Sequence, residues 1–141
     1  MAYIGKEPAS AVLSASDITD DIITTAKLAF AESTLTDGSS IDWNAATQDV
    51  CKVTLAGNRT LNAPTNPTTG QFISLLVIQD STGSRTLTFN AIYEFKDDTA
   101  PTLTTTASKG DVFVFRYNGS KWLEMGRNTN LTFAYGILCL L

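Results

Sequence analysis

The sequence predicts a mainly β protein, an antiparallel β-sandwich or jelly-roll-like domain preceded by an extended arm and a short helix. Between residues 50 and 125, short runs rich in β-branched and aromatic residues alternate with turns rich in Asn, Gly, Pro and Asp. Threonine, which packs well on a pleated sheet, occurs 21 times. About eight such runs in about 90 residues is the spacing typical of a sandwich or barrel.

The N-terminal segment is expected to form an arm and a helix. The first sixteen residues have no hydrophobic period, and Gly5 and Pro8 favour an extended arm. From Asp17 to Phe30, apolar residues recur at i, i+4, i+8, i+11 and i+12, which predicts a short amphipathic helix rather than the alternative, an extended strand. A helix of about three turns is marginal alone in water. Its apolar stripe must therefore pack on the same domain or on a neighbouring copy.

The first predicted strands are short and separated by clear turns. Residues 35–40 form a turn and a hinge, and the run 41–44 opens the first strand. Gly57-Asn58 predicts a hairpin that joins the run 50–55 to the run 59–62. Two prolines make residues 63–70 a loop, because proline cannot sit in a central strand.

The second half of the β-region carries the most apolar strands. The run 72–78 is apolar except for Ser74 and is the candidate central strand. The runs 85–89 and 93–96 alternate apolar and polar residues, and Asp97–Pro101 predicts a turn. In the run 112–117, Val112 and Val114 alternate with Phe113 and Phe115. Both faces of this strand are therefore apolar, which predicts burial on both sides. Asn118-Gly119 is the strongest hairpin signal and leads into 121–125.

The C-terminal segment is apolar and has no charge after Arg127. Its odd-numbered positions from 131 to 141 are all apolar, as expected of a strand, and Leu138 and Leu140 make its outer half apolar on both faces. If it were exposed, such an apolar strand would be prone to aggregation, so its own domain or another subunit must cover it. The predicted organisation is an arm with helix (1–37), a β-sandwich (38–127) and a terminal strand (128–141).

Composition excludes several classes of function. The chain has no histidine, which excludes the Ser-His-Asp triad and the common zinc sites. A net charge of −4 and a pI near 4.6 argue against binding of nucleic acid. Residues 1–37 hold six acidic and two basic residues, so the arm either docks on a basic partner or is simply solvated.

The acidic residues predict turns rather than a catalytic or metal site. Asp97-Asp98, with Glu94 nearby, lies in a proline-bounded turn, where Asp is common because it bonds its own backbone. Asp80 is the single carboxylate of its loop, too few for a calcium site. We therefore expect no catalytic residues, no metal and no cofactor, and a protein that is not an enzyme.

Cysteines, aromatic residues and targeting signals add little evidence for a special role. Cys51 and Cys139 are expected to pack as small buried hydrophobes. Trp43 and Trp122 are candidate glycan contacts, but in a small sandwich they are expected to pack in the core or at a subunit interface. No signal peptide is visible and the apolar tail is too short to span a bilayer, so no membrane association is expected.

Several short motifs resemble tail-fibre and other appendage proteins of tailed bacteriophages. The opening Ala2–Pro8 resembles the start of such proteins, and Asp21–Ala29 is similar to their "Ile-Thr-x-Ala-Lys-Leu/Ile-Ala" segment, which precedes the distal domains. The runs Leu55–Leu61, Gly110–Val112 and Tyr117–Trp122 resemble a small β-domain that recurs in phage virion proteins. The chain departs from a long fibre because it lacks a repeat shaft and a large receptor-binding tip.

The resemblance implies a homotrimer whose arm anchors it to other virion proteins and whose β-domain points outward. It also implies a location in the virion after synthesis in the host cytoplasm. The leading hypothesis is a short trimeric tail fibre or baseplate appendage; the alternatives are a capsid decoration (cement) protein and a carbohydrate-binding module for host surface glycans. The side chains expected at subunit interfaces are Tyr3, Ile4, Ile18, Ile22, Ala26, Phe30, Phe133, Tyr135 and Ile137.

Overall fold

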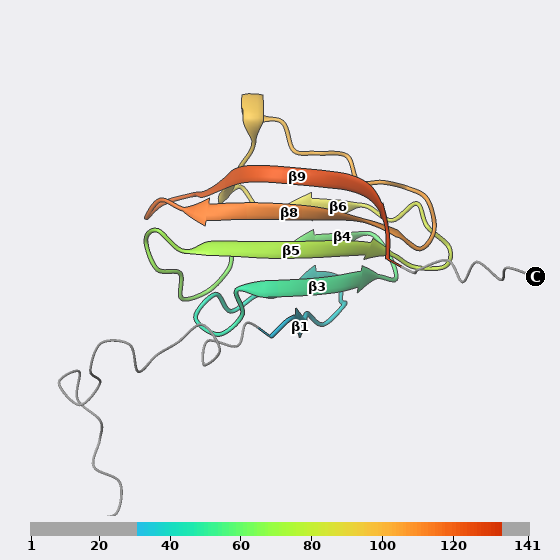
Figure 1. Ribbon diagram of the computed structural model, residues 1–141, viewed down its shortest axis with the longest axis horizontal. Coiled ribbons are helices and arrows are strands. Elements are labelled where there is room, and N and C mark those ends of the chain that lie inside the picture. The colour runs from blue at the N-terminus through green and yellow to red at the C-terminus, as the bar shows by residue number, and fades with distance from the viewer. Residues whose placement is uncertain (1–30, 134–141) are drawn as a thin grey trace, which may run out of the picture. The chain divides into compact units, whose positions relative to one another are not determined.

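The computed structural model describes residues 31–133, which form nine strands in two sheets that face each other (Figure 1). The mainly β prediction is confirmed. The predicted arm and helix, and residues 134–141, lie outside the described residues. The strands are β1 (Ser33–Thr34), β2 (Ser40–Ile41), β3 (Val50–Leu55), β4 (Arg59–Leu61), β5 (Phe72–Gln79), β6 (Leu87–Phe89), β7 (Tyr93–Glu94), β8 (Lys109–Tyr117) and β9 (Trp122–Thr132).

The first six strands form three stacked coils, each made of two consecutive strands. The first strand of each coil (β1, β3, β5) lies in a six-stranded sheet of order β1-β3-β5-β8-β9-β7. The second strand (β2, β4, β6) lies in a three-stranded sheet of order β2-β4-β6. Neighbouring coils pair in parallel: β1 with β3, β3 with β5, β2 with β4 and β4 with β6.

The antiparallel prediction is wrong for these coils, and so is the hairpin predicted at Gly57-Asn58. β3 and β4 lie in different sheets, so the turn between them is a corner. The reason is that the backbone groups of β4 are bonded by the coils on either side. The amide of Arg59 donates to the Thr86 carbonyl (2.9 Å), and that of Thr60 donates to the Ser39 carbonyl (3.1 Å).

The last long strands are antiparallel. β8 pairs with β5 and with β9, and the hairpin predicted at Asn118-Gly119 is confirmed. The Asn118 amide donates to the Lys121 carbonyl (3.0 Å), and Gly119 supplies the positive φ of 101° that the turn needs. β9 continues without a break across positions 127 and 128, where the sequence analysis had divided the domain from the terminal strand.

The core lies between the two sheets. Along β3 and β5 every second side chain is buried, as a strand with one covered face requires. On β8, Phe113 and Phe115 are fully buried, whereas the intervening Val112 and Val114 are half-buried on the other face. Edge-to-face or tilted contacts join aromatic rings across the core: Phe89, Tyr93, Phe95, Phe113 and Phe115.

Two predicted strands are shorter in the structure. The run 41–44 contributes β2 and one parallel bridge, between Asn44 and Thr65. The run 93–96 ends after Glu94 and leads into a turn of 3₁₀-helix, Lys96–Asp98, so the turn predicted there is confirmed. Among residues 31–133, no helix is long and apolar enough to cross a membrane.

Candidate interaction surfaces

The two tryptophans proposed as glycan contacts are buried. Trp43 is 1% exposed, and its indole N–H donates to the Gln48 carbonyl (2.6 Å). Trp122 is 0% exposed and packs against Tyr117, with ring centroids 4.9 Å apart. Neither ring offers a free face on which a sugar could stack, so in this fold the predicted glycan contact has no exposed aromatic surface at these positions.

Of the side chains predicted to lie at subunit interfaces, only Phe133 falls within the described residues. It follows the last residue of β9 and is 41% exposed. Its ring lies against Gly110 of β8: a Cβ built there would be 2.5 Å from both the Phe133 ring and the Val77 carbonyl oxygen. Gly110 therefore has to be glycine for β5, β8 and Phe133 to approach this closely.

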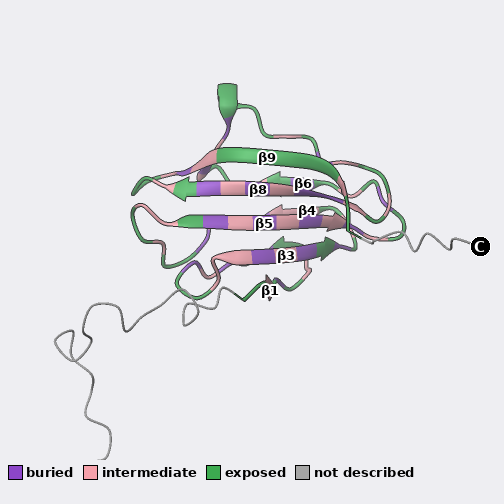
Figure 2. Cartoon of the chain, in the orientation of Figure 1, coloured by how far each residue is buried: buried purple, intermediate pink, exposed green. Residues whose placement is uncertain are grey.

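The face of the six-stranded sheet that points away from the core carries a group of apolar side chains, flanked on the same face by the polar Lys52, Thr54 and Arg116. We call it the apolar outer face and define it by seven residues that are half-buried or exposed: Val50, Phe72, Leu76, Ile78, Val112, Val114 and Leu123. Figure 2 shows half-buried and buried residues alternating along β5 and β8. In register, Leu76 lies opposite Val112, and Phe72 is 54% exposed at one end of the face.

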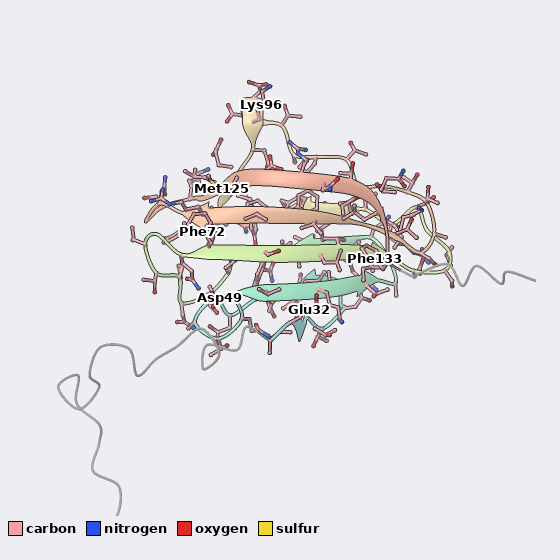
Figure 3. All side chains as sticks on the ribbon, in the orientation of Figure 1. Glu32, Asp49, Phe72, Lys96, Met125 and Phe133 are labelled. Atoms are coloured by element: carbon pink, nitrogen blue, oxygen red, sulfur yellow. The ribbon has the colours of Figure 1, made fainter. Side chains whose placement is uncertain are left out.

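Met125 lies beside this face (Figure 3). It is 56% exposed and falls at a register shift between β8 and β9, where Phe115 pairs with Glu124 and Val114 pairs with Gly126. Phe72, Met125 and Phe133 are the large hydrophobic residues most exposed among the described positions. A sheet face of this kind is normally covered by another layer or a partner.

The outward side chains of the three-stranded sheet have the opposite character. Ser40, Thr60 and Thr88 stand in register on β2, β4 and β6 and form a row of hydroxyl groups. Such a row suits direct contact with water. The two sheets therefore differ in the kind of surface that their outer faces offer to a partner.

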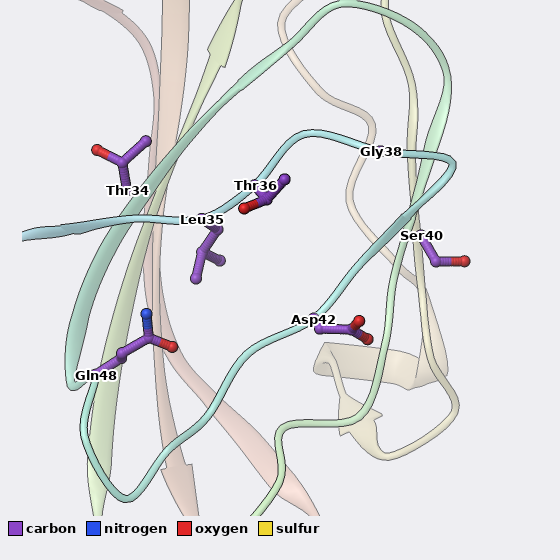
Figure 4. A pocket seen from close by; sticks show the side chains of 7 residues that line it. All are labelled: Thr34, Leu35, Thr36, Gly38, Ser40, Asp42 and Gln48. Atoms are coloured by element: carbon purple, nitrogen blue, oxygen red, sulfur yellow. The ribbon is translucent and has the colours of Figure 1, made fainter.

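A polar recess lies beside the first coil (Figure 4). Its volume is about 250 Å³, and it is lined by Thr34, Leu35, Thr36, Gly38, Ser40, Asp42 and Gln48. Two of its polar groups already have partners in the fold: Asp42 accepts a hydrogen bond from the side-chain NH₂ of Asn62 (2.8 Å), and the Gln48 side-chain oxygen accepts from the Asn44 backbone N–H (3.1 Å). Its hydroxyls could hydrogen-bond a polar ligand, but it holds no nucleophile–base pair.

Glu94 and Asp98 form a pair of carboxyl groups that affect each other's pKa. A hydrogen bond between their side chains raises the pKa of Asp98 and lowers that of Glu94, which Lys121 (3.1 Å) lowers further. Asp98 lies in the turn of 3₁₀-helix with a φ of 53°, and Glu94 is held by its ion pair with Lys121.

Asp80, the single acidic residue of its loop, is occupied by its own turn. One carboxylate oxygen accepts the backbone amides of Thr82 (2.9 Å) and Gly83 (2.8 Å), and the other accepts Arg85 (2.8 Å). These bonds, with Arg85 as the largest influence, lower the pKa of Asp80. Within residues 31–133, no group of three or more acidic or cysteine side chains is placed to hold a metal ion.

Asp111 is a structural residue that the sequence analysis missed. It is 1% exposed, and its carboxylate accepts bonds from the Thr104 amide (2.7 Å), the Thr104 hydroxyl (2.7 Å) and the Asn130 amide (2.9 Å). It thus joins the loop before β8 to β9. Its sequence context gave no signal, because the strand 109–117 also carries the charged residues Lys109 and Arg116.

Comparison with known proteins identifies the family. Residues 36–122, more than half of the chain, match the family model described as "Putative phage tail fibre C-terminal domain". The match runs from the first coil to the start of β9 and so includes most of both sheets. No curated protein and no solved structure matched the chain. The chain belongs to this family and is a phage tail structural protein of the tail-fibre type.

Proposed function

We propose that this protein is a short trimeric tail fibre or baseplate appendage, held on the phage particle by its N-terminal arm. The observation that carries the proposal is the family match over 36–122, which identifies the β-domain as the kind found at the C-terminal end of tail fibres. Residues 1–30 precede the strands of that domain and are left for attachment. Their acidic excess suits a basic docking surface on another virion protein.

The proposed trimer contacts lie in the arm. The side chains assigned to them are Tyr3, Ile4, Ile18, Ile22, Ala26 and Phe30, whose apolar stripe needs a covering surface. Phe133, Tyr135 and Ile137 were expected at a subunit interface, with packing in their own domain as the alternative. The proposed role is structural and not enzymatic, which the match to a tail-fibre domain family supports.

Size-exclusion chromatography with light scattering tests the trimer. We expect the full chain to elute with three times the mass of one 15.1 kDa chain. The matched variant Ile18→Asp/Ile22→Asp places two charges on the arm stripe and is expected to give monomers whose β-domain remains folded by circular dichroism. A wild-type protein that is a stable monomer would contradict the proposal.

Copy number in purified virions tests the location. Quantitative mass spectrometry should find a few copies per particle for a tail fibre or baseplate appendage, whereas the alternative, a capsid decoration protein, requires hundreds.

A glycan array tests the second alternative, a carbohydrate-binding module. Because Trp43 and Trp122 are buried, any glycan bound by the purified protein would have to use another surface.

A further inference from the structure

We propose that the C-terminal segment, residues 134–141, covers the apolar outer face of its own domain. The segment would lie across β8, β5 and β3 and form a third layer over the six-stranded sheet. This inference does not rest on the trimer, because it concerns a contact within one chain. It assigns Tyr135 and Ile137 to the domain rather than to a subunit interface.

The first argument is that the face needs a cover. Valine, leucine, isoleucine and phenylalanine side chains occupy most outward positions of β5 and β8, and Phe72 is 54% exposed. The hydroxyl row on the other sheet shows that this chain places polar residues on a face that meets water. The apolar outer face is therefore built for contact with an apolar surface.

The second argument is where the segment begins. β9 pairs with β8 up to Thr132, and Figure 1 shows its end bending past the end of β8 towards β5. The Phe133 ring then lies on Gly110, which has the same outward parity as Val112 and Val114. The segment thus leaves directly from one end of the face that it is proposed to cover.

The third argument is its length and chemistry. Residues 134–141 carry no charge and consist of apolar residues with one glycine and one tyrosine. Eight extended residues reach about 26 Å. Neighbouring strands are about 4.8 Å apart, so the distance from β8 to β3 is about 10 Å. The segment is long enough to cross the three strands and also to follow them towards Val50.

The native Cys139 permits a direct test in the full chain. In the variant Ser74→Cys, a near-isosteric change at the centre of the face, oxidation with copper–phenanthroline should join residues 74 and 139. Six extended residues from Phe133 reach about 20 Å, more than the roughly 13 Å along β5 between Ile78 and Ser74. Cys51 is 1% exposed and does not compete. Val112→Cys is a second variant for the case in which the first folds poorly.

Unfolding a mixture of unlabelled and ¹⁵N-labelled protein and refolding it before oxidation assembles the subunits at random and so separates contacts within and between chains. We expect the cross-linked peptide to carry one isotope only, with at least a fivefold higher yield than in the control Thr88→Cys, which lies on the hydroxyl row. Mixed-isotope peptides would overturn the inference and place the segment at a subunit contact. Equal yields in the two variants would also overturn it. Light scattering on the same samples reports the trimer separately.

Discussion

The stacked coils β1–β6 and the hairpin β8–β9 build adjoining parts of one sheet by different routes. In the coils, each strand pairs in parallel with a strand from the next coil, such as Val50 of β3 with Ser74 of β5. In the hairpin, the paired residues are neighbours in sequence, and Tyr117 pairs with Trp122 across a short turn. Turn residues therefore mark where the chain reverses in the hairpin, but in the coils they mark where it changes sheet.

The largest expected effect tests whether these regions form one cooperative unit. Phe113→Ala removes a fully buried ring of β8 that lies 5.5 Å from the Phe89 ring, and should cost about 3–5 kcal/mol of unfolding free energy. Leu75→Ala in β5, opposite Phe113, should cost about 2–5 kcal/mol. Urea unfolding measures both.

The two tryptophans allow the unfolding of the coils and of the hairpin to be measured separately. Trp43 reports on the coils and Trp122 on the hairpin, so the single-tryptophan variants W122F and W43F follow each region by fluorescence. We expect coincident midpoints, because β5 and β8 pair along their length and share the core. Two separate midpoints would show that the coils and the hairpin unfold independently. The exposed control Thr88→Ala should change stability by less than about 0.5 kcal/mol.

The second prediction concerns the polar contact that joins the hairpin to the loop before it. Asp111→Ala should cost about 3 kcal/mol, because it leaves the Thr104 backbone N–H without its buried acceptor and leaves the Asn130 N–H with only its bond to the Thr104 hydroxyl (3.0 Å). Thermal or urea unfolding measures the loss. Asp42→Ala, which removes an exposed carboxylate with one bond to Asn62, is the control and should have a small effect. A loss at Asp111 no larger than at Asp42 would contradict a structural role for this carboxylate.

The difference between the two regions also explains what the sequence could predict. Strand positions were largely correct, because alternating burial and turn residues are local signals: β3 was predicted to the residue and β5 to within one residue, whereas β8 begins three residues before the predicted run 112–117. The turn at Asn118-Gly119 was correct for the same reason. Parallel pairing was missed because it depends on residues in the next coil, about 20 positions away, and no local pattern distinguishes a corner at Gly57 from a hairpin.

The interaction surfaces follow the same division. The apolar run 72–78 was recognised, but the sequence could not show that its outward residues meet Val112 and Val114 on a face with no cover among residues 31–133. Burial of Trp43 and Trp122 fits the expectation of packing. The role of Asp111 could not be predicted, because its partners Thr104 and Asn130 come from separate segments that only the fold brings together.

The third prediction compares two glycines in loops that lead into and out of β5. Gly70 has a φ of 91° and open space around it, so Gly70→Ala should cost about 1 kcal/mol for the left-handed backbone alone. Gly83 has a φ of 74°, and a Cβ there would lie 2.5 Å from the Thr105 carbonyl oxygen. Because that atom belongs to the backbone, Gly83→Ala should cost about 2–3 kcal/mol. If urea unfolding gives equal losses of stability for the two variants, the loop before β8 can move away from position 83 and relieve the contact with Thr105.

The smallest expected effect concerns an ion pair between the first two coils. Arg59 of β4 donates to both carboxylate oxygens of Asp37, at 2.9 and 2.7 Å. The hydrogen bond from Arg59 lowers the pKa of Asp37 below its ordinary value of 3.8. A carboxylate whose folded pKa is lowered adds stability that is complete above the unfolded pKa and disappears as the pH falls through the folded value.

Asp37→Asn should therefore lower the melting temperature slightly at pH 7 and at pH 5, by a similar amount. The difference from wild type should shrink as the pH falls below 3.8, because the wild-type carboxylate then becomes protonated as well. Arg59→Gln should give the same pH profile, and the double variant should lose no more than either single change. If the difference in melting temperature stays constant down to pH 3, the charge of Asp37 does not stabilise the contact between the coils. Asp37 would then act only through the conformation of the turn between β1 and β2.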